Sequence, residues 1–297
     1  MSWIFYSLLA VFVFSFVNLF DKFFVSKKFK SVYSFVFVLN VVYFIFYLAY
    51  FFVFWKTFVY SNSFLWAIAS GFFYFFMWIF WFKALSGGEV SRSSAIFFTQ
   101  PLFNSVLAVI FLDESLSTMK WLAVGMIVIG AIFSSIESKK TKSGFNTAYF
   151  FALLATIFAS VGNTIVKHAT VVLPALTVGS IGYFFTLPFY FIFLKDKGVS
   201  LEVKEKLTNL KELILIFFRG MLGFTAINLF MSAIGSGPVS LVSALNGGQP
   251  LVVLILSILA SIFFPKLIKE EITEKSLAYK IVSVLLIVTG AVIISLF

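Results

Sequence analysis

About ten apolar stretches, each long enough for a helix to cross a bilayer, occupy most of the sequence. A transmembrane helix needs about 20 consecutive apolar residues. Such runs fall at roughly 2–20, 32–55, 64–85, 93–112, 118–136, 147–166, 171–194, 213–234, 238–263 and 277–297. A membrane β-barrel would instead show alternating segments of about 10 residues. The pattern therefore predicts an all-α membrane protein with about ten transmembrane helices.

Composition agrees with lipid as the main solvent. Hydrophobic residues make up 61% of the chain and charged residues 11%, whereas a soluble domain is about half apolar and about a quarter charged. The first run, from Trp3 to Phe20, has no basic residue before it and no small-residue cleavage site. It is therefore interpreted as a retained span and not as a signal peptide. The expected partner of the chain is the lipid bilayer, and the expected assembly is a monomer or a weak homodimer.

Several classes of function are excluded by the residues present. The chain has no cysteine and a single histidine, His168, so disulfides, thiolate metal sites and multi-histidine metal sites are not expected. No cofactor is expected either. An intramembrane enzyme would need paired acids, a His/Asp set or metal ligands within the spans, and the spans contain none. The net charge of +10 comes mainly from lysines in short loops, which favours anionic lipid headgroups over nucleic acid as the partner.

The two halves of the chain carry the same motifs in the same order. A Ser-x-x-Asn-x-x-x-Lys pattern occurs at Ser15, Asn18 and Lys22 and again at Ser160, Asn163 and Lys167. The pair Gln100-Pro101 recurs as Gln249-Pro250, 149 residues later. The predicted division is a first repeat at 1–136, a polar linker at 137–146 and a second repeat at 147–297. Since each repeat has five spans, an odd number, the second enters the membrane from the opposite face, as in inverted-repeat transporters.

These motifs resemble those of the drug/metabolite transporter superfamily, specifically the EamA-like type with two five-helix repeats. The residues that carry the resemblance are Ser15-Phe-Val-Asn18, Asp21-Lys22, Gln100-Pro101, Phe111-Leu-Asp113-Glu114-Ser-Leu116, Gly125 and Gly130, with the matching positions of the second half. The resemblance covers the whole chain. It implies the fold and a transport function, but no single substrate, because the family moves amino acids, nucleotide sugars, sugar phosphates, drugs and cations.

Two features depart from that pattern. The family's glycine-rich acidic turn is Asp113-Glu114 here, and its counterpart Glu270-Glu271 follows an insertion. No glutamate lies inside a span, whereas the small multidrug exporters of the superfamily carry a buried acid for proton coupling. This absence argues against proton-coupled export of cationic drugs, which is kept as an alternative function.

The two Gln-Pro pairs are the strongest candidates for a substrate cavity. Each pair lies near the middle of its span, where a proline removes a backbone hydrogen bond. Interrupted segments at matching positions in two halves indicate a transporter binding site. We therefore expect Gln100, Asn246 and Gln249 to face a shared cavity, with the helices broken at Pro101, Gly247, Gly248 and Pro250. A kink that serves packing alone is the alternative.

Polar residues inside other spans add further candidates. Asn18 and Asn163 each lie one turn from a lysine and either face the cavity or form hydrogen bonds between packed helices. Asn104 and Asn228 are assigned to packing. Arg219 is interpreted either as an anchor that reaches the headgroups or as a site for an anion.

The distribution of basic residues predicts the orientation. Of the 22 lysine and arginine residues, only Lys56, Lys120 and Lys167 fall in the loops after even-numbered spans, and Arg219 lies within a span. The positive-inside rule then places both termini outside the cytoplasm, while the family resemblance implies the reverse.

The segment from Lys195 to Glu212 has leucines at near-helical spacing among charges, which predicts a short helix on the membrane surface.

Together these patterns predict a secondary transporter of a small polar metabolite, anionic or zwitterionic, in a cell membrane. It would work by alternating access around a cavity at the midplane between the two repeats. A non-transporting scaffold or receptor is the competing class, and transport in proteoliposomes would distinguish the two.

Overall fold

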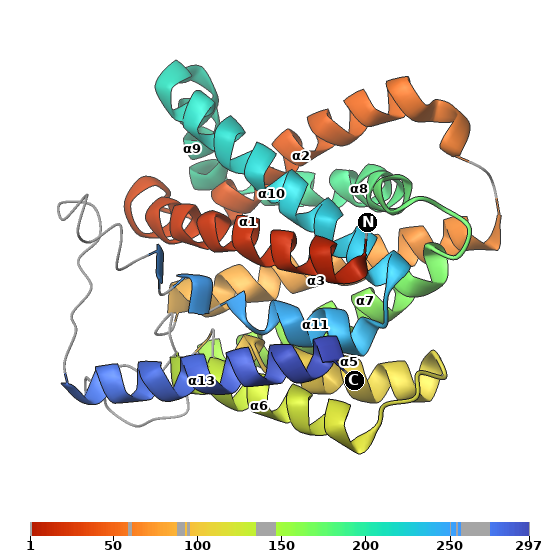
Figure 1. The fold of residues 1–297 in the computed structure, drawn as a ribbon. Coiled ribbons are helices and arrows are strands. Elements are labelled where there is room, and N and C mark those ends of the chain that lie inside the picture. The colour runs from red at the N-terminus through yellow and green to blue at the C-terminus, as the bar shows by residue number, and fades with distance from the viewer. Residues whose placement is uncertain are drawn as a thin grey trace.

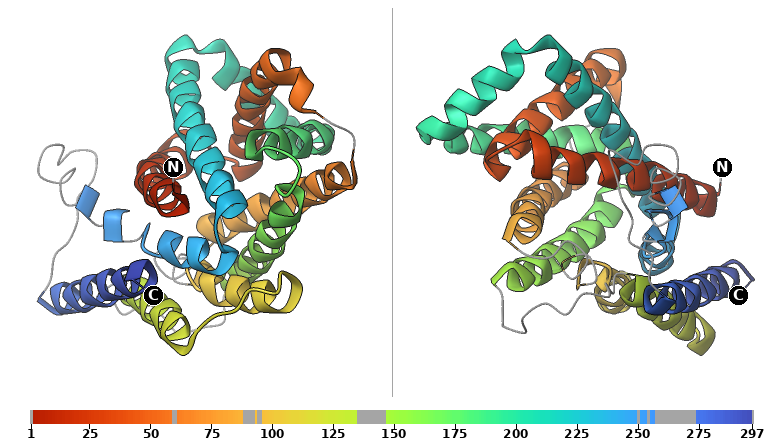
Figure 2. Two further views of the ribbon diagram at one scale, coloured as in Figure 1. Left: turned by 45° about the vertical axis from the view of Figure 1, so that its right-hand side comes forward. Right: turned by 90° about the vertical axis from the view of Figure 1, so that its left-hand side faces the viewer.

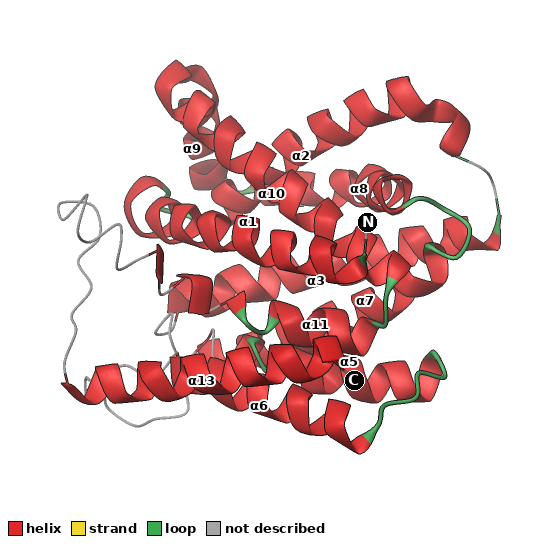
Figure 3. Ribbon diagram, viewed as in Figure 1, coloured by secondary structure: helices red, strands yellow, loops and turns green. Residues whose placement is uncertain are grey.

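The computed structural model describes residues 2–58, 61–87, 93, 96–134, 147–249, 251–253, 255–256 and 274–296. Within these ranges the chain forms helices joined by turns, and it contains no β-strand (Figure 3). The predicted linker at 137–146 and the helix-breaking Pro250 lie outside the described residues.

Each predicted apolar run contains a helix in the described part of the chain. The first half forms α1 (Trp3–Phe23), α2 (Val32–Phe54), α3 (Asn62–Gly87), α5 (Gln100–Phe111) and α6 (Thr118–Ser134). The second half forms α7 (Thr147–Ala169), α8 (Ala175–Tyr190), α10 (Leu210–Ser236), α11 (Val239–Asn246) and α13 (Glu274–Leu296). Among the described residues, α1, α2, α3, α7, α8 and α10 are long and apolar enough to cross a membrane, and α5, α6, α11 and α13 supply shorter apolar helices. The predicted all-α membrane fold is confirmed.

Short helical segments connect some of the long ones. They are the π-helix η1 (Phe24–Lys28), the 3-10 helices η2 (Trp55–Thr57) and η3 (Phe191–Lys195), and α9 (Lys197–Thr208). The helix predicted between Lys195 and Glu212 is thus confirmed as α9. Its N-cap is Asp196, whose side chain accepts a hydrogen bond from Val199 N at 3.1 Å, and such a cap satisfies one of the open amides of the first turn.

The main contacts between helices occur in pairs that are related by exchange of the two repeats. The helix α1 packs against α10 and α11, and its counterpart α7 packs against α3 and α5. Equivalent helices also meet across the repeats, as α2 with α8, α5 with α11, and α6 with α13. Figure 1 shows α6 and α13 side by side below the rest of the bundle, and Figure 2 shows the same pair from two further directions. This exchange symmetry is what inverted repeats produce.

The two termini lie toward the same end of the bundle, as an even number of crossings requires. Figure 1 and the right-hand view of Figure 2 place the N- and C-termini close together along the direction of the helices, with α9 at the other end. The outer surface is apolar, with Phe52 and Val53 each 70% exposed and Leu285 62% exposed. Side chains of this kind, exposed in the isolated chain, contact lipid in a membrane.

Glycines allow the closest helix contacts. A Cβ atom placed on Gly71 of α3 would lie 2.5 Å from the Cα atom of Gly182 on α8. Gly220 of α10, 149 residues after Gly71, lies against Val42 of α2 in the same way. The packing of α3 on α8 and that of α10 on α2 therefore both depend on a missing side chain, as close helix packing in membranes commonly does.

We expect the Gly71→Ala substitution to destabilise the protein by about 1–3 kcal/mol, because the new Cβ meets backbone atoms that cannot rotate away. Gly125→Ala is the matched control, since a Cβ at Gly125 has no neighbour within 4 Å and alanine favours the helix. Thermal unfolding of the purified protein in detergent measures both. Equal melting temperatures for the two variants would contradict this view of the α3–α8 contact.

Candidate functional site

The two interrupted spans break in the same way. At the first break, Thr99 N donates to Ile96 O at 3.1 Å and Leu102 N donates to Thr99 O at 3.0 Å. At the second, Gly248 N donates to Leu245 O at 3.0 Å and Leu251 N donates to Gly248 O at 3.1 Å. Each residue of the second set follows its partner in the first by 149 positions. Both spans are thus interrupted with the same backbone geometry in the two repeats.

The residues at the helix ends differ between the two breaks. Helix α5 begins at Gln100 with Thr99 as its N-cap and Pro101 in its first turn, a position where the missing amide costs nothing. Helix α11 ends at Asn246, and Gly247 and Gly248 form the turn that follows. Gln100 and Gln249 are thereby held at equivalent places beside the two turns.

A cavity of about 130 Å³ lies between the two halves. Its polar lining consists of Asn18, Asp21, Tyr74, Gln100, Asn163, Tyr183, Ser243, Asn246 and Gln249. Its aromatic lining adds Phe14, Trp78, Trp81, Phe97, Phe98 and Phe230. Both repeats contribute to the two sets, from α1 and α3 on one side and from α7, α8, α10 and α11 on the other. Pro101 and Gly247 also reach the cavity.

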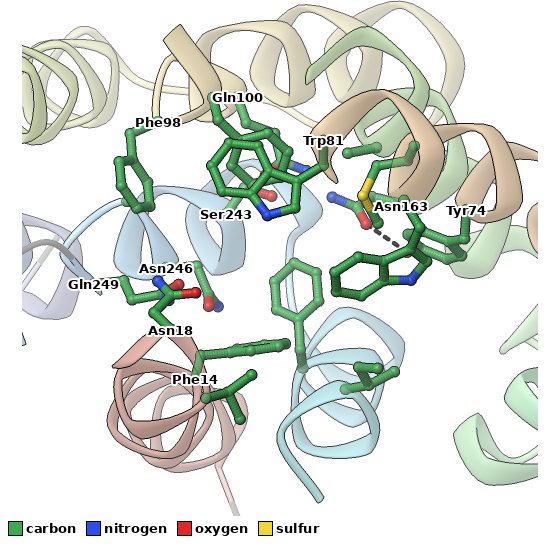
Figure 4. Close-up of a pocket in the computed structure, with 18 of the residues that line it drawn as sticks. Phe14, Asn18, Tyr74, Trp81, Phe98, Gln100, Asn163, Ser243, Asn246 and Gln249 are labelled. Atoms are coloured by element: carbon green, nitrogen blue, oxygen red, sulfur yellow. Dashed lines mark hydrogen bonds between the residues drawn. The ribbon is translucent and has the colours of Figure 1, made fainter. Parts of the chain in front are cut away.

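Four amide side chains on the cavity wall have few or no hydrogen-bond partners among the described residues. Figure 4 shows Asn18, Asn246 and Gln249 pointing toward one another from α1 and from the broken second span. Among the described residues, the side chains of Asn18, Gln100 and Gln249 form no hydrogen bond, and Asn246 Nδ2 donates only to Val242 O at 3.4 Å. An amide carries two donors and an acceptor. These groups are therefore open to a polar ligand.

Asn163 has a different role on the opposite wall. It accepts a hydrogen bond from Tyr74 Oη at 2.6 Å, as Figure 4 shows, and its Nδ2 donates to Asn104 Oδ1 at 3.5 Å. Asn104 Nδ2 in turn donates to Ser243 Oγ at 2.6 Å. Asn163 thus lines the cavity and also joins α7 to α3 and α5 through hydrogen bonds.

Arg219 lies inside the bundle, behind the cavity wall. It is fully buried, so it does not reach the headgroups, and it does not line the cavity. Its Nε and Nη2 atoms donate to the two carboxylate oxygens of Asp21, each at 2.7 Å, and Nη1 donates to Tyr43 Oη. Gly223, four residues further along α10, leaves the room for this contact, since a Cβ there would lie 2.7 Å from Nη1.

Asp21 is a site residue that the sequence reasoning did not select. It is 4% exposed and lies on the cavity wall between Arg219 and the open space. The sequence indicates that Arg219 needs a partner of opposite charge, because it lies inside a span, but it does not indicate which acid supplies that charge. The aromatic lining was also missed, because the hydropathy of phenylalanine is the same whether it faces lipid or a cavity.

Lys167 does not line the cavity, and its side chain stabilises the turn between α10 and α11. Its Nζ donates to Ile234 O at 3.0 Å and to Gly237 O at 2.8 Å, where a helix C-terminus attracts positive charge. Glu114 accepts from Val239 N at 2.6 Å at the start of α11. The carboxylate and the ammonium group therefore hold the two sides of one turn. Lys22, the counterpart of Lys167, has a side chain outside the described residues.

A helical membrane protein of two inverted repeats, with matching helix breaks beside a central cavity, has the architecture of a membrane transporter. The sequence model of the EamA-like transporter family matches residues 1–136 and 146–296. The chain belongs to this family, and with it to the drug/metabolite transporter superfamily. Membership in a family of transporters also argues against an enzymatic role.

Comparison with solved structures supports the same fold. A protein crystal structure with no more specific description resembles the chain with a TM-score of 0.68 at 14% sequence identity. The similarity covers 99% of this chain and 97% of the other. No curated protein sequence matches the chain.

We expect Lys167→Met to lower the melting temperature in detergent by several degrees, because the carbonyl groups at the end of α10 lose a charged donor. Lys56→Met is the control, since Lys56 is exposed at the end of α2 and its charge has no comparable contact among the described residues. Unchanged melting of Lys167→Met would show that the lysine does not stabilise the turn.

Proposed function

We propose that the protein is a secondary transporter that moves a small polar metabolite by alternating access around the cavity between the two repeats. The observation that carries the proposal is the group of amides open to this cavity, at Asn18, Gln100, Asn246 and Gln249. They come from both repeats, so a ligand that they bind would contact both moving halves at once. The two helix breaks beside it are the places where each repeat can bend.

The cavity lining favours a metabolite with a polar group and an apolar part. Amides offer donors and acceptors without charge, and the aromatic side chains offer flat apolar faces, such as those of Trp78 and Trp81. No described lining side chain carries an unpaired charge, because Asp21 is paired with Arg219. A zwitterion, whose charges balance, suits such a surface better than a simple anion.

Two other functions fit less well. A lipophilic cation would need a carboxylate free to receive it, and the carboxylate of Asp21 is occupied by Arg219. A receptor or scaffold gives no reason for the repeated backbone geometry at the two breaks. Export of cationic drugs and a non-transporting role are therefore the secondary alternatives.

We expect Gln249→Leu to reduce the initial rate of transport at least about tenfold, since the loss of one hydrogen bond to a charged group of the substrate costs about 1.5–3 kcal/mol. The assay is uptake of radiolabelled amino acids and sugar phosphates into proteoliposomes, after a thermal-shift screen for ligands. Thr225→Val, on the exposed side of α10, is the control and should transport normally. A fully active Gln249→Leu protein would remove this residue from the substrate site.

Our proposal places both termini outside the cytoplasm, because the basic residues concentrate at the other end of the bundle. A C-terminal reporter that is active only in the cytoplasm should therefore give no signal, and one that is active only outside the cytoplasm should give a signal. A cytoplasmic signal would reverse the orientation and leave the cavity and its ligand unaffected.

A further inference from the structure

The ion pair between Asp21 and Arg219 separates the cavity from its nearest positive charge. Asp21 lies on the cavity wall, whereas Arg219 lies behind it and does not reach the open space. The bidentate contact uses Nε and Nη2 of the guanidinium, and Tyr43 takes Nη1. The rings of Phe35 and Tyr43 lie 5.8 and 5.9 Å from the guanidinium carbon. The carboxylate of Asp21 therefore contacts Arg219 and also lines the cavity.

The charge balance of this site restricts which ions can bind to it. Removing one partner of a buried ion pair is strongly unfavourable, because the other charge is left without compensation. Within the described residues, Asp21 and Arg219 are the only charged groups at the cavity and behind its wall, and their charges cancel. A proton on Asp21 would leave Arg219 unpaired unless an anion arrived to replace the carboxylate. An anion without a proton would likewise add an unbalanced negative charge.

We propose that Asp21 and Arg219 form an exchange site that binds one proton and one carboxylate or singly charged phosphate group together. The proton forms an O–H bond on the Asp21 carboxylate, which then releases the guanidinium. The anionic group of the substrate takes the place of the carboxylate on Arg219, whose planar fork fits both kinds of anion. The site is neutral before and after the exchange, so substrate and proton bind and leave as a pair. This inference rests on the proposed transport function and specifies how it is coupled.

The neighbouring groups leave Asp21 as the site of the proton. Tyr43 faces the pair from α2 and Tyr183 approaches it from α8, and phenols titrate well above the physiological range. Asn18, one turn earlier on α1, carries no charge, and α3 and α7 present Tyr74 and Asn163 to the cavity. The side chain of Lys22, next to Asp21 in the chain, lies outside the described residues.

The first test replaces the acid and supplies an anion from solution. Asp21→Asn leaves Arg219 unpaired, so the variant should melt at a lower temperature than the native protein. Sodium acetate, compared with acetamide at constant ionic strength, should raise its melting temperature by about 5 °C at saturation. Acetate should raise the melting temperature of the native protein less at pH 7, because a proton must bind with it, and it should have no effect on the double variant Asp21→Asn with Arg219→Gln. A folded Asp21→Asn protein that does not respond to acetate would overturn the proposal.

The second test needs no substitution and decides the matter if Asp21→Asn does not fold. Benzoate, which combines a carboxylate with an aromatic ring, is titrated into the native protein calorimetrically in two buffers of different ionisation enthalpy. The proposal requires about one proton taken up per benzoate bound. Binding without proton uptake, or no binding between pH 5 and 8, contradicts it. If the protein transports substrate in proteoliposomes and both tests are negative, only the exchange site is refuted. If both tests are positive and no transport is found, only the transport function is refuted.

Discussion

The ion pair between Asp21 and Arg219 joins the two repeats inside the bundle, where Arg219 is fully buried and Asp21 is 4% exposed. Asp21 belongs to α1 and Arg219 to α10, and the bidentate contact satisfies both oxygens of the carboxylate at once. A charged residue in the hydrocarbon region is tolerated only when it is paired inside the protein. The packing of α1 on α10, the glycine at Gly223 and the tyrosine at Tyr43 can all be understood as the surroundings that this pair requires. It also makes the cavity beside it electrically neutral.

The requirement that a polar group inside the membrane has a partner also explains the polar contacts away from the ion pair. The carbonyls at the end of α10 receive Lys167, and the amides at the start of α11 receive Glu114. Asn163, Tyr74, Asn104 and Ser243 form a continuous chain of hydrogen bonds across four helices. Against this background the unpaired amides of Gln100 and Gln249 are exceptions. Since they occur at the helix breaks and face open space, a ligand or water is their natural partner.

Much of the fold could be predicted from the sequence, because hydropathy and repetition are local properties of the chain. The apolar runs, the surface helix α9 and the interruptions at Gln100-Pro101 and Gln249 were all visible in this way. The partner of Arg219 was not, since Asp21 is 198 positions away and only the inverted packing brings the two together. Hydropathy also could not show which of the 44 phenylalanines face the cavity, because a phenylalanine side chain is equally compatible with lipid and with an apolar pocket.

The central claim is that one cavity opens in turn to each side of the membrane. The chain has no cysteine, so a single cysteine introduced at Phe98, on the cavity wall, can be labelled without background. A membrane-impermeant maleimide is applied to sealed vesicles of both orientations, with and without ligand. The account predicts labelling from both sides, with a ligand changing the ratio of the two rates. Labelling from one side only under every condition would show a closed-ended pocket and contradict alternating access.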